Sequence, residues 1–130
     1  MADKKYTVLY VDDEQINLEL FKALFIMHYN VLLAESPIEA LDMLKKTQVD
    51  LIVTDQKMPE MTGVEFLKEV FKIFPNEPPY RILTSGYTEI ESVSDAFDNY
   101  KLLKSIPKPW NIALLKSAIA EVLETGKVEL

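Results

Sequence analysis

The chain has 130 residues, of which 48% are hydrophobic and 27% charged, and these proportions indicate one globular domain. The absence of cysteine excludes disulfide bonds and thiolate zinc sites. A formal net charge of −7 argues against direct nucleic-acid binding, because such proteins usually carry a basic patch. The first residues lack the apolar core of a signal peptide, and no apolar run is long enough to span a membrane. We therefore expect a single domain over residues 1–130.

Short apolar runs alternate with longer segments whose apolar residues recur at helical spacing. The runs predict strands at residues 7–11, 30–34, 51–54 and 80–84, and a short one within 101–106. The periodic segments predict helices over residues 16–27, 38–44, 64–74, 90–97 and 112–123. Five strand–helix units in succession indicate an α/β fold, in which helices cover both faces of a parallel sheet.

The apolar stripes also predict which helix residues face the core. In the first helix, the expected buried residues are Ile16, Leu20, Leu24 and Met27, flanked by Phe21 and Phe25. In the second helix, they are Ile38, Leu41 and Leu44. Three helix starts carry a serine or threonine followed three residues later by glutamate, the capping-box arrangement, at Ser36, Thr62 and Thr88. Gly126 is the expected C-cap of the last helix.

Ligands of open parallel sheets bind beyond the carboxyl ends of the strands, so the residues that follow each strand are the candidate site. The first strand is followed by Asp12 and Asp13, and the third ends at Asp55. Two unit negative charges about 4 Å apart repel by roughly 4 kcal/mol at an effective dielectric near 20. A hard cation would compensate this repulsion, and carboxylates favour Mg²⁺ or Mn²⁺ over zinc. The alternative is structural: Asp12 and Asp13 cap a helix, and Asp55 belongs to a turn.

A hydroxyl group and an amine follow the later strands. Thr84 and Ser85 come after the fourth strand, and Lys108 comes after the fifth. A carboxylate can attack phosphorus, and catalysis of phosphoryl transfer rests mainly on positioning and charge stabilisation. A lysine and a hydroxyl group supply that stabilisation. The alternatives are a solvated lysine and an ordinary loop turn.

Four motifs in chain order resemble the receiver domain of two-component response regulators. They are Tyr10-Val11-Asp12-Asp13-Glu14, Val53-Thr54-Asp55-Gln56-Lys57-Met58-Pro59 with Gly63, Leu83-Thr84-Ser85-Gly86-Tyr87, and Lys108-Pro109-Trp110. Each motif alone is weak, but the four at these spacings are specific and cover essentially the whole chain. The resemblance implies a flavodoxin-like, doubly wound three-layer sandwich, with a parallel sheet in the order 2-1-3-4-5 and an ordered core over about residues 5–124.

The resemblance also implies a role for each residue of the site. Asp55 would be the phosphoacceptor, Asp13 a direct Mg²⁺ ligand, and Asp12 an acid that acts largely through water. The backbone carbonyl of Lys57 would complete the metal contacts, and Lys108 would contact the phosphoryl group.

The switch hydroxyl is expected from Ser85 rather than Thr84. Ser85 lies 30 residues after Asp55 (85 − 55), and Ser85-Gly86 fits the family's pattern of a hydroxyl residue before a small one. One position departs from the family. Ser105 stands three residues before Lys108, where the family often has a tyrosine or phenylalanine. The usual coupling between the hydroxyl and an aromatic ring is therefore in doubt, and Tyr87, Tyr100 or Trp110 are candidates to replace it.

The implied function is a phosphoacceptor switch of bacterial two-component signalling, which catalyses only its own phosphorylation and dephosphorylation. Its partners would be a histidine kinase or phosphotransfer protein and a downstream effector, in the cytoplasm and without contact to nucleic acid or membrane. A homodimer through the fourth helix, fifth strand and fifth helix is also implied.

Three other classes of function fit the sequence less well. A phosphatase with an aspartyl-phosphate intermediate usually places its nucleophile on the first strand, and here the candidate is on the third. A docking module with an inert acidic site does not require the four-part constellation. A flavin or nucleotide binder would need a glycine-rich loop after the first strand, and none is there.

Overall fold

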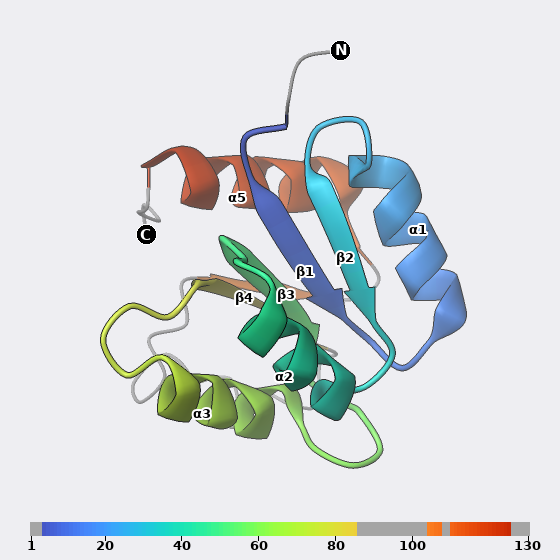
Figure 1. Ribbon diagram of the computed structural model, residues 1–130. Helices are drawn as coiled ribbons and strands as arrows, with labels where there is room; N and C mark the ends of the chain where they lie inside the picture. Colours follow the sequence, from blue (N-terminus) through green and yellow to red (C-terminus); the bar gives the residue numbers. More distant parts are fainter. Residues whose placement is uncertain (1–3, 86–103, 108–109, 126–130) are drawn as a thin grey trace.

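The computed structural model describes residues 4–85, 104–107 and 110–125 of the chain (Figure 1). In chain order, the elements are β1 (Thr7–Val11), α1 (Gln15–Phe25), β2 (Asn30–Ala34), α2 (Pro37–Lys46), β3 (Leu51–Asp55), α3 (Gly63–Ile73), β4 (Tyr80–Ser85), β5 (Lys104–Pro107) and α5 (Ile112–Thr125). The predicted strands agree with these bounds to within a residue or two, apart from the start of β5, which the prediction left open. The helix predicted over residues 90–97, Thr88 and Gly126 lie outside the described residues.

The five strands form one parallel sheet in the order β2-β1-β3-β4-β5, which confirms the predicted topology. The pairing register fixes which strand ends are level with one another. Val11 pairs with Thr54, and Asp55 pairs with Thr84. The carboxyl ends of β1, β3 and β4 therefore lie side by side at one edge, where the predicted site residues are found.

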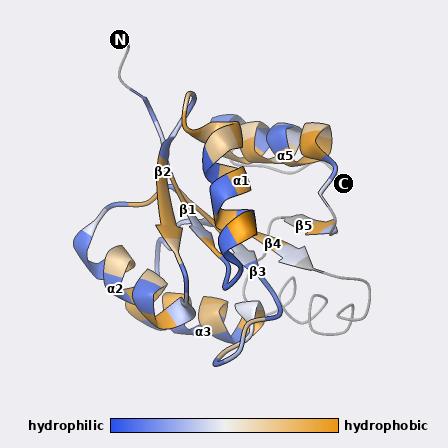
Figure 2. Cartoon of the chain, turned by 90° about the vertical axis from the view of Figure 1, so that its right-hand side faces the viewer, coloured by the Kyte–Doolittle hydropathy of each residue, from blue (hydrophilic) through white to orange (hydrophobic). Residues whose placement is uncertain are grey.

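The sheet separates two hydrophobic cores, because successive strand residues point to opposite faces. Leu9 and Val11 face a core built with α2 and α3, whereas Val8 and Tyr10 face a core built with α1 and α5. Figure 1 shows these helix pairs on opposite sides of the sheet. Figure 2 shows that the helices carry apolar residues on one side and polar residues on the other. The structure is thus the predicted three-layer sandwich.

The buried face of α1 differs from the predicted stripe. Ile16 is 77% exposed and Met27 is 76% exposed, and Met27 lies beyond the end of the helix. The buried residues of the helix are Leu18, Phe21 and Phe25. Two large aromatic rings bury more apolar surface than the isoleucine and methionine would, so the helix turns its phenylalanine face to the sheet.

The starts of α2 and α3 follow the predicted capping signals to different degrees. At α3, Thr62 and Glu65 form the complete reciprocal capping box. At α2, the Ser36 hydroxyl accepts from the Glu39 backbone N–H at 3.1 Å, but the Glu39 carboxylate accepts from the N–H of Glu35 instead of Ser36.

The predicted burial of Ile38 in α2 is wrong, since its side chain is 60% exposed. The buried residues of α2 include Ala40 instead.

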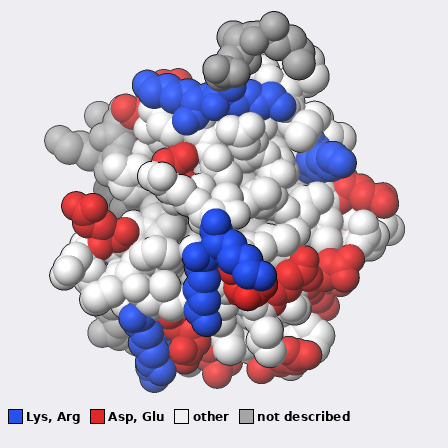
Figure 3. All heavy atoms as spheres, viewed as in Figure 1, with Lys and Arg blue, Asp and Glu red and all other residues white. Residues whose placement is uncertain are grey.

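Among the described residues, no helix is both long enough and apolar enough to cross a membrane. Figure 3 shows both signs of charge on the face seen in Figure 1, with a blue band near the top, blue side chains near the centre and several acidic groups gathered at the lower right.

The α3-side core gives the first prediction. Phe66 is fully buried there, so Phe66→Ala should lower the free energy of unfolding by about 3–5 kcal/mol, through lost burial and the cavity that remains. Urea denaturation measures this loss. Ile38→Ala is the control, since an exposed side chain should change stability by no more than about 0.5 kcal/mol. Equal losses in the two variants would contradict the assigned core.

Candidate functional site

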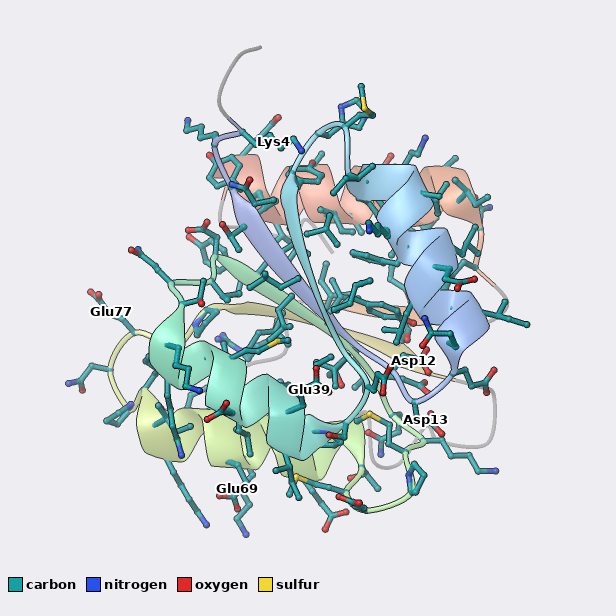
Figure 4. The ribbon with its side chains drawn as sticks, turned by 45° about the vertical axis from the view of Figure 1, so that its right-hand side comes forward. Lys4, Asp12, Asp13, Glu39, Glu69 and Glu77 are labelled. Atoms are coloured by element: carbon teal, nitrogen blue, oxygen red, sulfur yellow. The ribbon has the colours of Figure 1, made fainter. Side chains whose placement is uncertain are left out.

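Three carboxylates meet at the carboxyl end of the sheet, as the sequence predicts. Asp12 and Asp13 follow β1, Asp55 ends β3, and one carboxylate oxygen of each lies within 4.8 Å of the others. Figure 4 shows Asp12 and Asp13 at the end of β1, beside the start of α1. Asp12 and Asp55 are buried, whereas Asp13 is exposed. The site thus combines two acids of the interior with one that reaches solvent.

The composition of this cluster fits a hard divalent cation. All three ligand atoms are carboxylate oxygens, which Mg²⁺ and Mn²⁺ prefer, and no nitrogen or sulfur ligand is part of the cluster. Buried carboxylates so close together need a compensating positive charge or a proton. Lys57, whose backbone carbonyl is a predicted ligand, lies two residues beyond Asp55 in the following loop, and its side chain is exposed.

Tyr10, Asn17 and Glu14, all among the described residues, donate hydrogen bonds to Asp12. The Tyr10 hydroxyl donates to its Oδ2 at 2.5 Å, and Asn17 Nδ2 donates to the same oxygen at 3.0 Å. The backbone N–H of Glu14 donates to Oδ1 at 3.0 Å. The N-cap of α1 is Glu14, so the alternative of Asp12 as the helix cap does not hold. These bonds stabilise the ionised form of a carboxylate that has no contact with water.

Tyr10 lies in the core, with no exposed surface. Burial, and then the hydrogen bond to Asp12, raise the pKa of Tyr10 above its ordinary value, so the phenol keeps its proton and acts as a donor. The motif that contains Tyr10 did not predict this role. A signal was nevertheless present, because residues two apart along an extended chain project to the same side.

The loop after Asp55 is fastened at both ends by Gln56. Its backbone N–H donates to the carbonyl of Thr84 at 3.0 Å, and its carbonyl accepts from the Gly63 N–H at 2.9 Å. Its side-chain Oε1 accepts from the N–H of Val64 at 2.9 Å, so it satisfies an amide in the first turn of α3. Gln56 is buried, which the sequence does not predict, because nothing local distinguishes it from a solvated glutamine.

The other predicted site residues are only partly described. Ser85 is the last residue of β4, and Ser105 lies in β5. Thr84 is buried opposite Asp55, and its hydroxyl has no hydrogen-bond partner within the described part of the chain. Lys108 lies outside the described residues, as do Tyr87 and Tyr100. The choice of Ser85 over Thr84 as the switch hydroxyl and the role of Lys108 stay predictions.

A hollow of about 820 Å³ lies far from the acidic cluster, among the segments that lead into β3 and β4. Arg81 lines it, with its guanidinium 5.1 Å from the centre of the Phe71 ring and a hydrogen bond to the carbonyl of Pro79. The hollow is at the amino ends of the strands, so it does not contribute to the acidic site.

The geometry of this site agrees with comparisons with known proteins. Residues 8–120 match the response regulator receiver domain family, and the chain belongs to that family. It is therefore a receiver domain of two-component signalling. Members of this family are signalling switches that generally bind Mg²⁺ at an acidic pocket and interact with histidine kinases and effector domains.

Individual relatives differ in how much of their length the chain matches. It is 39% identical over 110 residues to the hydrogenase transcriptional regulatory protein HoxA of Cupriavidus necator, covering 85% of this chain and 22% of that protein. It is 33% identical to a chemotaxis protein CheY homolog of Campylobacter jejuni, covering 94% of this chain and 95% of that protein.

Solved structures agree with this assignment. A response regulator receiver domain protein from Clostridium thermocellum superposes with a TM-score of 0.85 at 26% identity, covering 94% of this chain and 97% of that one. The chain spans about a quarter or less of the HoxA relatives, 22% of one and 25% of another.

The contact between Gly63 and Asp55 gives the second prediction. A Cβ atom at Gly63 would lie 2.4 Å from the Asp55 carbonyl oxygen and 2.7 Å from Leu83 Cδ1. Helix propensity alone favours alanine by up to about 1 kcal/mol, but this overlap should dominate, so Gly63→Ala should destabilise the fold by about 1–3 kcal/mol. Urea denaturation measures the change, with the exposed Glu60→Ala as control. A stabilised Gly63→Ala would contradict the close packing of α3 on the end of β3.

Proposed function

We propose that the chain accepts a phosphoryl group on Asp55 from a phosphohistidine of a histidine kinase or phosphotransfer protein. The observation that carries the proposal is the convergence of three carboxylates at the ends of two adjacent strands, with Asp55 at the end of the central strand β3. A structural turn or cap would not need two buried acids beside a third. The family resemblance assigns Asp55 the same role.

The proposed reaction is an in-line displacement at phosphorus. A carboxylate oxygen of Asp55 attacks, the phosphorus–nitrogen bond of the phosphohistidine breaks, and neutral histidine leaves after taking up a proton. The product is an acyl phosphate on Asp55, which adds about −1.5 to −2 charges at the end of the sheet. Water later cleaves this acyl phosphate and restores the carboxylate, so the chain would catalyse only its own phosphorylation and dephosphorylation.

Asp12, Asp13, Asp55 and the backbone carbonyl of Lys57 are the groups that would hold Mg²⁺ or Mn²⁺. The ion, when bound, would neutralise the negative charge that gathers around the phosphoryl group. Asp13 is exposed and open to direct ligation, whereas both oxygens of Asp12 already accept hydrogen bonds, which favours action through water. Ser85 and Lys108 would donate to the remaining phosphoryl oxygens.

The proposed output is a change in protein binding. Phosphorylation would shift a balance between two conformations of the loops after β3 and β4 and of the surface beside β5. That surface would bind an effector protein or domain, or a second copy of the chain, rather than nucleic acid. The match to nearly all of a chemotaxis CheY homolog supports a receiver that acts alone, and the match to one part of HoxA supports a receiver within a longer regulator. The resemblance also leads us to propose a cytoplasmic location.

The acceptor assignment gives the third prediction. With acetyl phosphate and Mg²⁺, the intact wild-type protein should gain the mass of one phosphoryl group, because Asp55 provides the attacking oxygen. Asp55→Asn should gain none, since an amide is a poor nucleophile. Asp50→Asn is the control, because Asp50 directly precedes β3 at the end far from the cluster. Equal labelling of Asp55→Asn, or sustained release of phosphate from a simple phosphomonoester, would contradict the proposal.

The metal assignment gives the fourth prediction. Asp13→Asn should weaken Mg²⁺ binding by at least about tenfold, because it removes a charged oxygen ligand. Glu14→Gln is the matched control, since Glu14 is the adjacent exposed acid and is not part of the cluster. Isothermal titration calorimetry with MgCl₂ measures both affinities. A larger loss in Glu14→Gln than in Asp13→Asn would contradict the ligand assignment.

A further inference from the structure

We propose that Tyr10 is a positioning residue that holds Asp12 in the acidic site and couples this site to the start of α5 through the ring of Trp110. The inference deepens the proposed function and rests on it. It assigns to Tyr10 two roles, one through its hydroxyl group and one through its ring.

The hydroxyl role follows from the surroundings of Asp12. Neither Tyr10 nor Asp12 has any exposed surface, so bulk water cannot replace a hydrogen bond that is lost between them. Oδ2 of Asp12 takes two side-chain donors, the Tyr10 hydroxyl at 2.5 Å and Asn17 Nδ2 at 3.0 Å. Together with the Glu14 amide on Oδ1, they fix the rotation of the carboxylate. Partners of this kind orient the acids of metal sites.

The ring role follows from the aromatic cluster behind the site. The Tyr10 ring stacks on Phe21, with centroids 4.4 Å apart and planes inclined by 13°. It meets Trp110 edge-on at 5.4 Å, and Phe21 also meets Trp110 at 6.2 Å. Trp110 lies two residues before the first residue of α5. A closely packed core transmits displacements. A shift of Asp12 would therefore move Tyr10 and, through it, the Trp110 ring beside the start of α5.

The surroundings of Trp110 allow its ring to move together with Tyr10. Its indole Nε1 is buried and has no hydrogen-bond partner among the residues that the structure describes. Its ring contacts with Tyr10 and Phe21 pack it against the core on the α1 and α5 side of the sheet. Ser105, where the family often has an aromatic residue, offers no ring of its own. The Tyr10–Trp110 contact instead provides an aromatic connection behind Asp12.

The test compares two hydroxyl deletions in the same core. Tyr10→Phe keeps the ring and removes the bond to Asp12. Tyr29→Phe is the matched control, because Tyr29 packs on Phe25 in this core and has no part in the acidic cluster. Trp110 is the only tryptophan, so tryptophan fluorescence reports on the surroundings of this ring. Mg²⁺, and then Mg²⁺ with beryllofluoride, are titrated into each variant, and urea denaturation verifies that each is folded.

The expected result separates the two variants. Wild type and Tyr29→Phe should bind Mg²⁺ alike and change their Trp110 emission with beryllofluoride. Tyr10→Phe should bind Mg²⁺ about tenfold more weakly and lose most of the Trp110 response, while still gaining phosphoryl mass from acetyl phosphate at saturating Mg²⁺. If Tyr10 served only to stabilise the fold, Tyr10→Phe would lower the stability of the protein. The folded variant would then keep the wild-type Mg²⁺ affinity and the wild-type change in Trp110 emission.

Two outcomes would overturn the inference. One is a Tyr10→Phe variant with wild-type Mg²⁺ affinity and a wild-type Trp110 response. The other is a wild-type protein that is phosphorylated without any change in Trp110 emission, which would leave the proposed function standing. A wild-type protein that takes no phosphoryl group on Asp55 would instead refute the proposed function itself, and with it the coupling.

Discussion

The repulsion among three carboxylates at one end of the sheet is the constraint on which this structure depends. The register of the parallel strands sets the ends of β1 and β3 beside each other, so Asp12 and Asp55 cannot move apart without breaking the sheet. Both are buried, so water screens their charges poorly. A divalent cation held by these carboxylates would relieve the repulsion, and its positive charge would also support phosphoryl transfer.

The surroundings of the acids keep them in place rather than letting them relax. Tyr10 and Asn17 hold Asp12 from the core and from α1. Gln56 ties the loop after Asp55 to β4 and to the first turn of α3, where Gly63 allows the helix to approach the strand. The buried acids Asp12 and Asp55 are therefore preorganised, because strand ends and helix starts hold them.

The sequence predicted the features that follow from local rules. Strand runs, their parallel arrangement and the acids at their ends needed only side-chain periodicity and the rule for ligand sites of α/β sheets. The buried face of α1 was predicted wrongly at Ile16, since several apolar stripes fit one helix and tertiary packing selects among them. The bonds of Tyr10 and Gln56 were not predicted, because they join the site to elements whose approach only the folded chain defines.

The central claim is that Asp55 carries the phosphoryl group, and chemical mapping tests it most directly. Borohydride reduces an acyl phosphate to an alcohol, so treatment of the phosphorylated protein should convert the acceptor aspartate to homoserine. Peptide sequencing by mass spectrometry then locates the converted residue. We expect homoserine at position 55 and unchanged aspartates at positions 12 and 13. Conversion at either of those acids, or none in a protein that has gained a phosphoryl group, would contradict it.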